Sequence, residues 1–368
     1  MKLSYFMMPV HEKDKDYSIS LAEDVEAIEL ADQLGFAEAW VGEHHCSSVE
    51  PITSPLMFLA NMIARTKRIK LATGVMCMSQ YHPGMIAGHA AMFDHLSRGR
   101  FIMGIGPGGL PPDFELFGVT DEDRGAMMVE SIDTILKIWS TDPPYDIKGK
   151  YWTTRVQDWV HDDIGLGRMV KPFQQPHPPI AVSAMSPYSG MMRLAAVRDF
   201  ETISANFIGE WSVKSHWETF CDECDKQDKR PGPSHWRVAR SVHVADSAQE
   251  AEDVVKQPGG AFDYYYDYLF TIFDRAEMKA AFVTEKGDDP EALNHEKLVD
   301  KLVIRGTAAS VTEQLLAFRD EVGPFDNLVM TAHDWTDKAK MRRSMELMAT
   351  EVIPAMTRAI GPTASAAE

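Results

Sequence analysis

Three titratable side chains stand in a row at Glu43, His44 and His45, directly after the apolar stretch AEAWVG (residues 37–42). Histidine exchanges a proton near neutral pH and also binds metal ions. Adjacent side chains on an extended chain point to opposite sides, so His44 and His45 are poorly placed to hold one ion together. The pattern favours a catalytic proton-transfer or hydrogen-bonding role for these histidines and not a chelate.

A glycine-rich turn follows another apolar run in the stretch FIMGIGPGGL (residues 101–110). Its GxG pattern is part of the dinucleotide-binding fingerprint, but that fingerprint also needs a helix that opens at its third glycine. Pro107, Pro111 and Pro112 are expected to prevent such a helix. We expect the glycines, Gly106 among them, to let a flat molecule come close to the backbone.

A third candidate lies in SAMSPYSGMMRLAAV (residues 183–197), where a helix is expected to begin. Ser186, Ser189 and Gly190 stand at this expected helix start. Free N–H groups and hydroxyls at such a position bind phosphate. The simpler alternative is ordinary N-capping, which needs only one serine.

These clusters need elements to position them, and the apolar runs predict eight strands, each followed by a helix. The predicted strands are residues 3–8, 37–42, 69–75, 101–106, 180–186, 201–207, 238–245 and 327–333. Eight such units indicate a TIM (β/α)₈ barrel of the α/β class, and a doubly wound open sheet is the alternative. The carboxyl ends of barrel strands gather at one rim, which is where we expect the site.

The strand pattern predicts a single domain over residues 1–360 with two long excursions. Residues 142–178 are rich in proline and aromatic residues and are expected to form a lid or a packed surface insertion. Residues 247–302 are expected to be largely helical. The small, polar residues 361–368 are expected to be a disordered tail.

Composition and charge exclude several classes of partner. The net charge of −18 repels nucleic acid and anionic membranes, so a small molecule is the expected partner. The N-terminal residues do not resemble a secretory signal, and no apolar run reaches the ~18 residues of a spanning helix, so a cytoplasmic location is expected. Cys221 and Cys224, in a CDEC helix, are expected to be reduced and structural.

The stretches WVGEHH, LATGV, YHPG and LSRGRFIMGIGPG, together with the serine-bearing turn, resemble the bacterial luciferase-like flavin-dependent monooxygenase family. The resemblance is closest to the limonene and diketocamphane monooxygenase-like members and covers residues 1–210 in good order. It implies a barrel that takes reduced FMN from a separate flavin reductase. The implied reaction uses dioxygen, through a flavin C(4a)-peroxide, to oxygenate a small hydrophobic substrate of the terpenoid or ketone class. Homodimers are common in the family.

The resemblance also implies roles for single residues. His44 matches the catalytic histidine of the family. The segment beneath the flavin ring, where the family often has a non-prolyl cis peptide (here Gly74–Val75), comprises Ala72, Thr73, Gly74 and Val75. The phosphate-binding segment comprises Met185, Ser186, Ser189 and Gly190. Luciferase has a phosphate-binding arginine and a reactive cysteine at the turn where this chain has Gly106 and Pro107, so the cation that pairs with the phosphate is not placed.

An oxygenating flavin site needs a dry cover, and the substrate-contacting residues are expected to be Met7, Met76, His82 and Trp335. No metal ion is required, because the flavin carries the oxygen chemistry. Three alternatives stay open. They are a deazaflavin-dependent oxidoreductase that transfers hydride on the same fold, a catalytically silent flavin-binding barrel, and a metal-dependent barrel hydrolase with His44, His82 and His333 as ligands.

Overall fold

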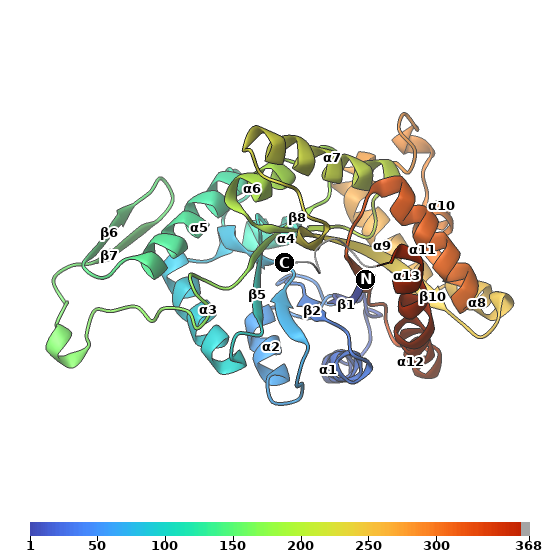
Figure 1. Cartoon of the computed structure of the whole chain (residues 1–368), viewed down its shortest axis with the longest axis horizontal. Helices are drawn as coiled ribbons and strands as arrows, with labels where there is room; N and C mark the ends of the chain where they lie inside the picture. The colour runs from blue at the N-terminus through green and yellow to red at the C-terminus, as the bar shows by residue number, and fades with distance from the viewer. Residues whose placement is uncertain (362–368) are drawn as a thin grey trace. The chain divides into compact units, whose positions relative to one another are not determined.

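The computed structural model of the chain describes residues 1–361, and Figure 1 shows the course of its helices and strands. The tail expected to be disordered lies outside the described residues except for Gly361. Among residues 1–361, none of the helices is both long and apolar enough to cross a membrane.

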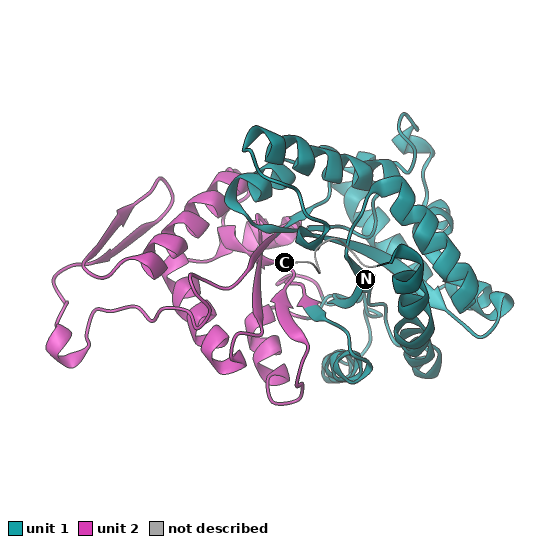
Figure 2. Ribbon diagram, viewed as in Figure 1, with its two compact units in different colours: residues 1–39, 48–51, 182–368 teal, residues 40–47, 52–181 magenta. Residues whose placement is uncertain are grey.

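The chain divides into two compact units, coloured separately in Figure 2. Unit 1 contains residues 1–39, 48–51 and the chain from residue 182 onward, and unit 2 contains residues 40–47 and 52–181. The strands β2 (Glu38–Val41) and β8 (Ile180–Ala184) cross these boundaries. Each unit is described by itself.

Unit 1 is built on parallel strands. They are β1 (Lys2–Met7), β9 (Glu201–Ser204), β10 (Trp236–Val244), β11 (Val303–Gly306) and β12 (Asn327–Thr331). The strand β1 pairs with β12, which pairs in turn with β10. All nine residues of β10 are buried, and this strand pairs with β9 near its start and with β11 near its end.

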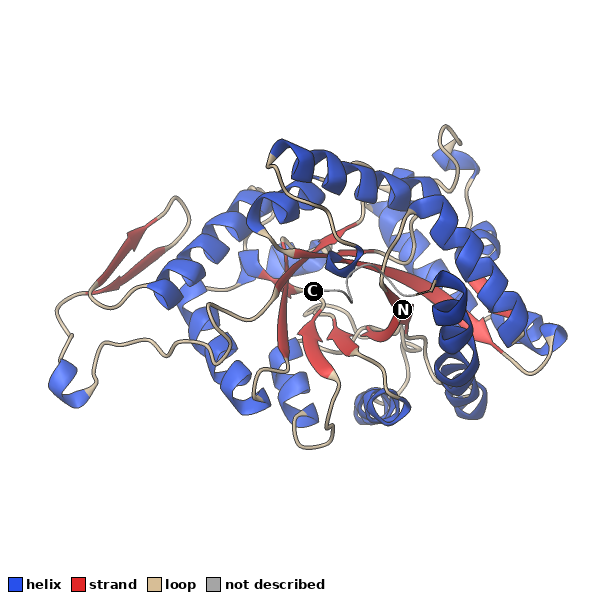
Figure 3. Ribbon diagram, viewed as in Figure 1, coloured by secondary structure: helices blue, strands red, loops and turns tan. Residues whose placement is uncertain are grey.

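The helices of unit 1 alternate with strands along the chain, and Figure 3 distinguishes helices from strands by colour. They are α1 (Tyr17–Leu34), α6 (Gly190–Arg198), α7 (Glu210–Lys226), α8 (Ala248–Val255), α9 (Ala261–Arg275), α10 (His295–Leu302), α11 (Ala308–Val322), α12 (Lys338–Leu347) and α13 (Ile353–Ile360). The helix α1 begins directly after Asp16. The carboxylate of Asp16 accepts hydrogen bonds from the N–H groups of Ser18 and Ile19, which is the N-cap geometry.

Unit 2 contains parallel strands and the helices that follow them. The strands are β3 (Lys70–Thr73), β4 (Met76–Cys77) and β5 (Phe101–Gly106), and β5 pairs with both of the others. The helices are α2 (Pro55–Met62), α3 (Pro83–Ser97), α4 (Pro111–Leu116) and α5 (Arg124–Ser140). Pro111 and Pro112 do not prevent a helix as expected but open α4, because proline is tolerated in a first helical turn.

The excursion at residues 142–178 carries an antiparallel hairpin, β6 (Tyr145–Lys148) and β7 (Thr153–Val156), that the sequence pattern did not predict. The carboxylate of Glu130 in α5 anchors the hairpin turn, because it accepts hydrogen bonds from the backbone N–H groups of Lys150, Tyr151 and Trp152. The turn of the hairpin is therefore held against α5.

Candidate functional site

Glu43 and His45 belong to one hydrogen-bonded cluster in unit 2, beyond the end of β2. The carboxylate of Glu43 is buried and accepts hydrogen bonds from the Tyr81 hydroxyl and from the backbone N–H of Cys77 at 2.8 Å. His45 Nε2 lies 3.2 Å from the Tyr81 hydroxyl, and its ring packs edge-on against Phe117. Burial, together with the charge of Glu43, raises the pKa of Tyr81, so the phenol stays protonated. His45 is thus anchored within the wall of the unit.

His44 turns to a different partner, Asp113 in α4. Its Nδ1 lies 3.4 Å from Asp113 Oδ2, and the imidazole is 14 % exposed. The backbone N–H groups of His45 and Cys46 also donate to the Asp113 carboxylate, at 3.1 and 2.7 Å. This one carboxylate therefore fixes both the loop after β2 and the ring of His44.

The charge state of Asp113 decides the tautomer of His44. Burial raises the pKa of this carboxyl, but the hydrogen bonds from His44 and from two backbone N–H groups outweigh burial and lower it. An ionised carboxylate can only accept hydrogen bonds, so the proton of a neutral His44 ring lies on Nδ1. His44 Nε2 is then left to accept a proton. An imidazole oriented by a carboxylate in this way is a candidate general base.

The end of β3 packs tightly against β5. The structure has a cis peptide bond between Gly74 and Val75, at the predicted position. A Cβ at Gly104 would lie 1.9 Å from the carbonyl oxygen of Thr73, and one at Gly106 would lie 2.6 Å from a methyl group of Val75. Gly104 and Gly106 therefore leave room for the protein's own segment that begins with β3, whereas a Cβ at Gly109 would meet no atom within 4 Å.

The four residues predicted beneath the flavin ring differ in exposure. Ala72 and Thr73 are fully buried, and the Thr73 hydroxyl donates to the carbonyl oxygen of Gly104. Flavin contact at these four residues and at Gly106 stays a prediction. Of the four, Gly74 and Val75 are the ones that are partly exposed.

The serine-bearing turn in unit 1 leads into α6, whose N-cap is Ser189: its hydroxyl accepts a hydrogen bond from the N–H of Met191 at 3.2 Å. Met185, Ser186 and Gly190 are exposed, and a Cβ built at Gly190 would meet no atom within 4 Å. Ser189 itself is buried. The accessible groups at the start of α6 are therefore Ser186 and the backbone of Gly190, and free N–H groups with a hydroxyl beside them are what an anion site requires.

Residues of α7 brace the same turn. His216 Nε2 donates to the carbonyl oxygen of Ser186 at 2.9 Å, and the hydroxyl of Ser215 accepts from the N–H of Tyr188 at 2.9 Å. Burial lowers the pKa of His216 to about 4, so the ring is neutral at neutral pH. The exposed Arg193 donates from its guanidinium to the carbonyl oxygen of Tyr188 at 3.2 Å, which brings a cation to the turn.

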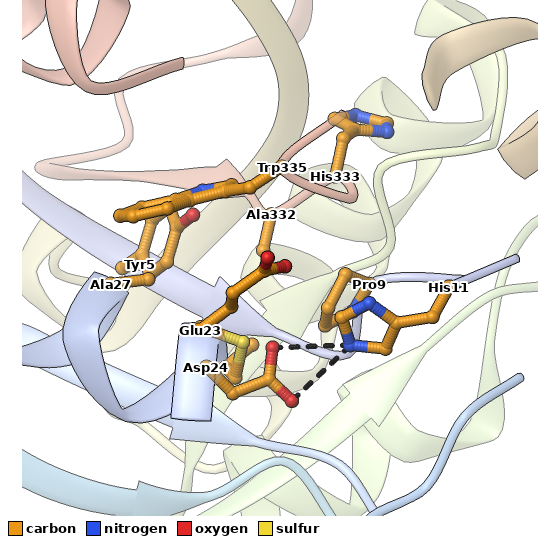
Figure 4. A pocket seen from close by; sticks show the side chains of 10 residues that line it. Tyr5, Pro9, His11, Glu23, Asp24, Ala27, Ala332, His333 and Trp335 are labelled. Atoms are coloured by element: carbon orange, nitrogen blue, oxygen red, sulfur yellow. Dashed lines mark hydrogen bonds and ion pairs between the residues drawn. The ribbon is translucent and has the colours of Figure 1, made fainter. Parts of the chain in front are cut away.

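Met7 and Trp335, predicted to contact substrate, line one small cavity of unit 1. Its lining residues are Tyr5, Met7, Pro9, His11, Glu23, Asp24, Ala27, Ala332, His333 and Trp335. Figure 4 shows Trp335 beside Tyr5 at one side of this cavity and His11 with Asp24 at the other. The cavity volume of about 10 Å³ suffices for one water molecule, so their contact with substrate stays a prediction.

Met76 and His82, the other predicted substrate contacts, lie in unit 2. Met76 is 2 % exposed. His82 is exposed and caps α3, because its Nδ1 accepts a hydrogen bond from the N–H of Gly84. A substrate role for either residue also stays a prediction.

The ligand set of the alternative metal hydrolase has other partners. His44 binds Asp113, His82 caps α3, and His333 Nε2 binds the Ser241 hydroxyl at 3.0 Å. Among residues 1–361, the group of possible ligands whose atoms lie within 4.8 Å of one another is His11, Glu23 and Asp334. Lys15 Nζ lies 2.5 Å from both carboxylates of that group, so an ammonium already supplies their positive charge.

Sequence reasoning missed Asp113, Tyr81, His216 and Arg193. Asp113 follows the glycine-rich end of β5, and Tyr81 stands in the stretch YHPG after β4; these are the local features that mark them. Their pairing with His44 and His45 depends on the tertiary structure.

The chain matches the family model of luciferase-like monooxygenases over residues 1–323. A relative from Streptomyces nodosus subsp. asukaensis, 4-hydroxyprotoasukamycin monooxygenase, is 34 % identical over 98 % of this chain and 94 % of its own length. Limonene 1,2-monooxygenase of Rhodococcus erythropolis is 28 % identical over 97 % of this chain and 87 % of its own length.

A solved structure is similar over nearly the whole chain. It is the oxygenating constituent of 3,6-diketocamphane monooxygenase from Pseudomonas putida, a type II Baeyer–Villiger monooxygenase in complex with FMN. The TM-score is 0.87 at 28 % identity, over 96 % of this chain and 98 % of that one. The predicted TIM (β/α)₈ barrel is confirmed, and the alternative of a doubly wound open sheet is wrong. The chain belongs to the luciferase-like monooxygenase family, and as an enzyme it is a monooxygenase.

Proposed function

We propose that this protein is the oxygenase component of a two-component system, which receives reduced FMN from a separate flavin reductase and uses dioxygen to oxygenate a small hydrophobic substrate. A terpenoid or a ketone is the proposed substrate class, in line with the names of the similar limonene and diketocamphane enzymes. The FMN and the words "oxygenating constituent" in the description of the similar structure support the cofactor and the need for a second component.

The observation that carries the proposal is the pair of His44 and Asp113 at the end of a barrel strand, where barrel enzymes place their catalytic residues. Reduced FMN, when bound, supplies the electrons that activate dioxygen. Asp113 holds the proton of His44 on Nδ1, and His44 Nε2 accepts or returns a proton as the substrate is oxygenated. His45, held by Tyr81 and Glu43, positions the backbone that carries His44.

For the phosphate of FMN, we propose the turn before α6. Ser186 and Ser189 supply hydroxyls, and Gly190 supplies an accessible backbone N–H at the positive end of the helix dipole. Met185 precedes them in the same exposed turn. Arg193 is the proposed cation, in place of the arginine that luciferase has at another turn.

For the flavin ring, we propose the segment Ala72–Val75 with Gly106, and for the substrate Met7, Met76, His82 and Trp335. Buried methionine and tryptophan side chains keep a reaction space dry, which an oxygenase needs because water diverts the activated oxygen to peroxide.

We further propose a cytoplasmic homodimer whose chains each form one domain over residues 1–360. The helices α2 and α3 of unit 2 expose large apolar side chains on their surfaces, which supports an interface there. These are Met57 (76 % exposed), Met92 (57 %) and Leu96 (56 %). A single cooperative unfolding transition in calorimetry tests the domain proposal, which two separate transitions would contradict.

Anaerobic titration with reduced FMN, followed by pulses of dioxygen in the presence of a panel of ketones and terpenoids, tests the function. We expect saturable FMN binding and oxygenated product from some panel members. Tight binding of a deazaflavin with weak FMN binding would favour hydride transfer. FMN binding without oxygen consumption for any substrate would favour a silent flavin-binding barrel.

A charge change at the cap of α6 gives a specific prediction for the phosphate site. Aspartate is as good an N-cap as serine, so we expect Ser189→Asp to change the free energy of unfolding by less than about 1 kcal/mol. Its negative charge repels phosphate, so the dissociation constant of reduced FMN is expected to rise at least tenfold, which is about 1.4 kcal/mol. The matched control is Ser247→Asp, at the N-cap of α8, which should leave the affinity unchanged. Equal affinities for the two variants would place the phosphate elsewhere.

A further inference from the structure

A second small cavity of unit 1 is lined by residues of β10, β12 and α12. The lining residues are Tyr5, Val242, His243, Phe262, Met330, Thr331, His333, Trp335, Met341, Ser344 and Met345. Its volume of about 10 Å³ suits one water molecule and no larger ligand. Of the residues proposed to contact substrate or flavin, Trp335 alone lines this cavity.

Three polar side-chain atoms among these lining residues have no hydrogen-bond partner within residues 1–361: Nδ1 of His243, Nδ1 of His333 and Oγ1 of Thr331. The three residues are 1 %, 3 % and 1 % exposed. Buried polar side chains are nearly always hydrogen-bonded to protein or to ordered water. All three residues line the same cavity, and one partner inside it would satisfy all three atoms.

The hydrogen bonds around Ser241 fix the tautomer of His333. The Ser241 hydroxyl accepts from Tyr266 Oη at 3.1 Å and from Asn206 Nδ2 at 3.3 Å, which occupies both of its lone pairs. Its own proton is then left for His333 Nε2, at 3.0 Å. His333 therefore accepts at Nε2 and carries its proton on Nδ1, the atom without a partner.

The polar groups on the cavity wall are uncharged. Burial lowers the pKa of His333 to about 3 and that of His243 to about 4, so both rings are neutral at neutral pH. Neutral His333 presents an N–H donor, while Thr331 offers a hydroxyl that donates or accepts. A neutral molecule that both donates and accepts hydrogen bonds matches this wall better than an ion does.

We propose that this cavity is a binding site for one ordered water molecule, which accepts a hydrogen bond from His333 Nδ1 and donates to His243 Nδ1 and Thr331 Oγ1. With these contacts the water has three partners, the usual number for a buried water. It completes a hydrogen-bonded chain that runs from His243 through the water, His333 and Ser241 to Asn206, and so joins β10 to the segment that follows β12.

A high-resolution crystal structure of the full-length protein and of two variants tests the proposal. We expect a water peak at roughly 2.7–3.2 Å from the three atoms in the unaltered protein and in Thr331→Ser, which keeps the hydroxyl. The peak should be lost in Thr331→Val, which keeps the shape and removes the hydroxyl. An empty cavity in the unaltered protein, or a metal ion revealed there by anomalous scattering, would overturn the proposal.

A second measurement does not depend on any variant. Imidazole ¹⁵N NMR of the unaltered protein at neutral pH should show His333 as the Nδ1–H tautomer and a magnetisation transfer from that proton to a long-lived water. The Nε2–H tautomer, or the absence of a bound-water signal next to an assigned His333, would contradict the hydrogen-bond arrangement.

Discussion

An alanine in place of His44 is expected to lower the rate of coupled oxygenation by roughly 10²-fold or more, since a positioned general acid or base contributes about 10²–10⁴-fold. The expected loss is specific to proton transfer. Reduced FMN should bind the variant about as tightly as it binds the unaltered protein, and the oxygen consumed should appear as peroxide instead of product. The measurement is the ratio of product to peroxide per oxygen consumed, with the panel substrate that gives the most product.

The variant Asp113→Asn keeps the imidazole of His44 but changes the group that orients it, so it tests the contribution of that orientation. The amide keeps the size of the carboxylate but loses its charge and places a donor where His44 Nδ1 now donates. We expect a smaller fall in turnover than with His44→Ala, together with a shifted pH profile, because the preferred tautomer of His44 changes. The control is His235→Ala, an exposed histidine just before the start of β10, which should keep full activity. Full product yield from His44→Ala would show that the imidazole takes no part in the reaction.

The barrel was predictable because its strands are apolar runs that end in glycine or polar residues. The predicted strands correspond to β1, β2, β3, β5, β8, β9, β10 and β12. The missed strand β11 has four residues and directly follows α10, so that its apolar residues continue the helical pattern. The hairpin was also missed. Residues of β7 are alternately exposed and half-buried, so the strand lacks the apolar face by which a strand is recognised in a sequence.

The candidate site was predictable only in part, for a physical reason. His44, Ser186 and Ser189 are visible because strand ends and helix starts are local features with known chemistry. Asp113 is 69 positions from His44, and only the packing of α4 beneath the loop brings the two together. The role of Asp113 was not predicted, because Pro111 and Pro112 were interpreted as preventing a helix directly after the glycine-rich turn. In the structure these prolines form the first turn of α4, which carries Asp113.

A second large effect is expected from a charge network of unit 1 that has no place in the proposed reaction. The imidazole of His11 is 2 % exposed and lies between two carboxylates, with Nδ1 2.7 Å from Asp334 and Nε2 3.3 Å from Asp24. Asp334 also accepts the backbone N–H of Trp335 at 3.0 Å. The network therefore connects the loop after β12 to α1 and to the segment between β1 and α1. We expect His11→Ala to lower the free energy of unfolding by about 3–5 kcal/mol, because it leaves the buried Asp24 without a compensating charge.

This network also predicts a pH dependence. Burial lowers the pKa of His11, but the hydrogen bonds and charges of Asp24 and Asp334 outweigh it and raise the pKa from its ordinary value of 6.5 to about 9. A raised folded-state pKa means that the stabilisation is complete below pH 6.5 and is lost as the pH rises through about 9. The shift corresponds to roughly 3 kcal/mol. Denaturant unfolding at pH 6 and at pH 9.5 should show this loss in the unaltered protein and not in His11→Ala.

The double variant His11→Ala/Asp24→Asn distinguishes a lost ion pair from a lost side chain. If the cost of His11→Ala arises from an uncompensated carboxylate, neutralising Asp24 recovers part of the stability, and the double variant unfolds at a higher denaturant concentration than the single one. If the cost arises from the cavity left by the imidazole, the second substitution brings no recovery. Lys15 continues to pair with Asp334 and Glu23 in both variants, so the recovery isolates the pair of His11 and Asp24. A double variant no more stable than His11→Ala would contradict the assignment of the cost to an uncompensated Asp24 carboxylate.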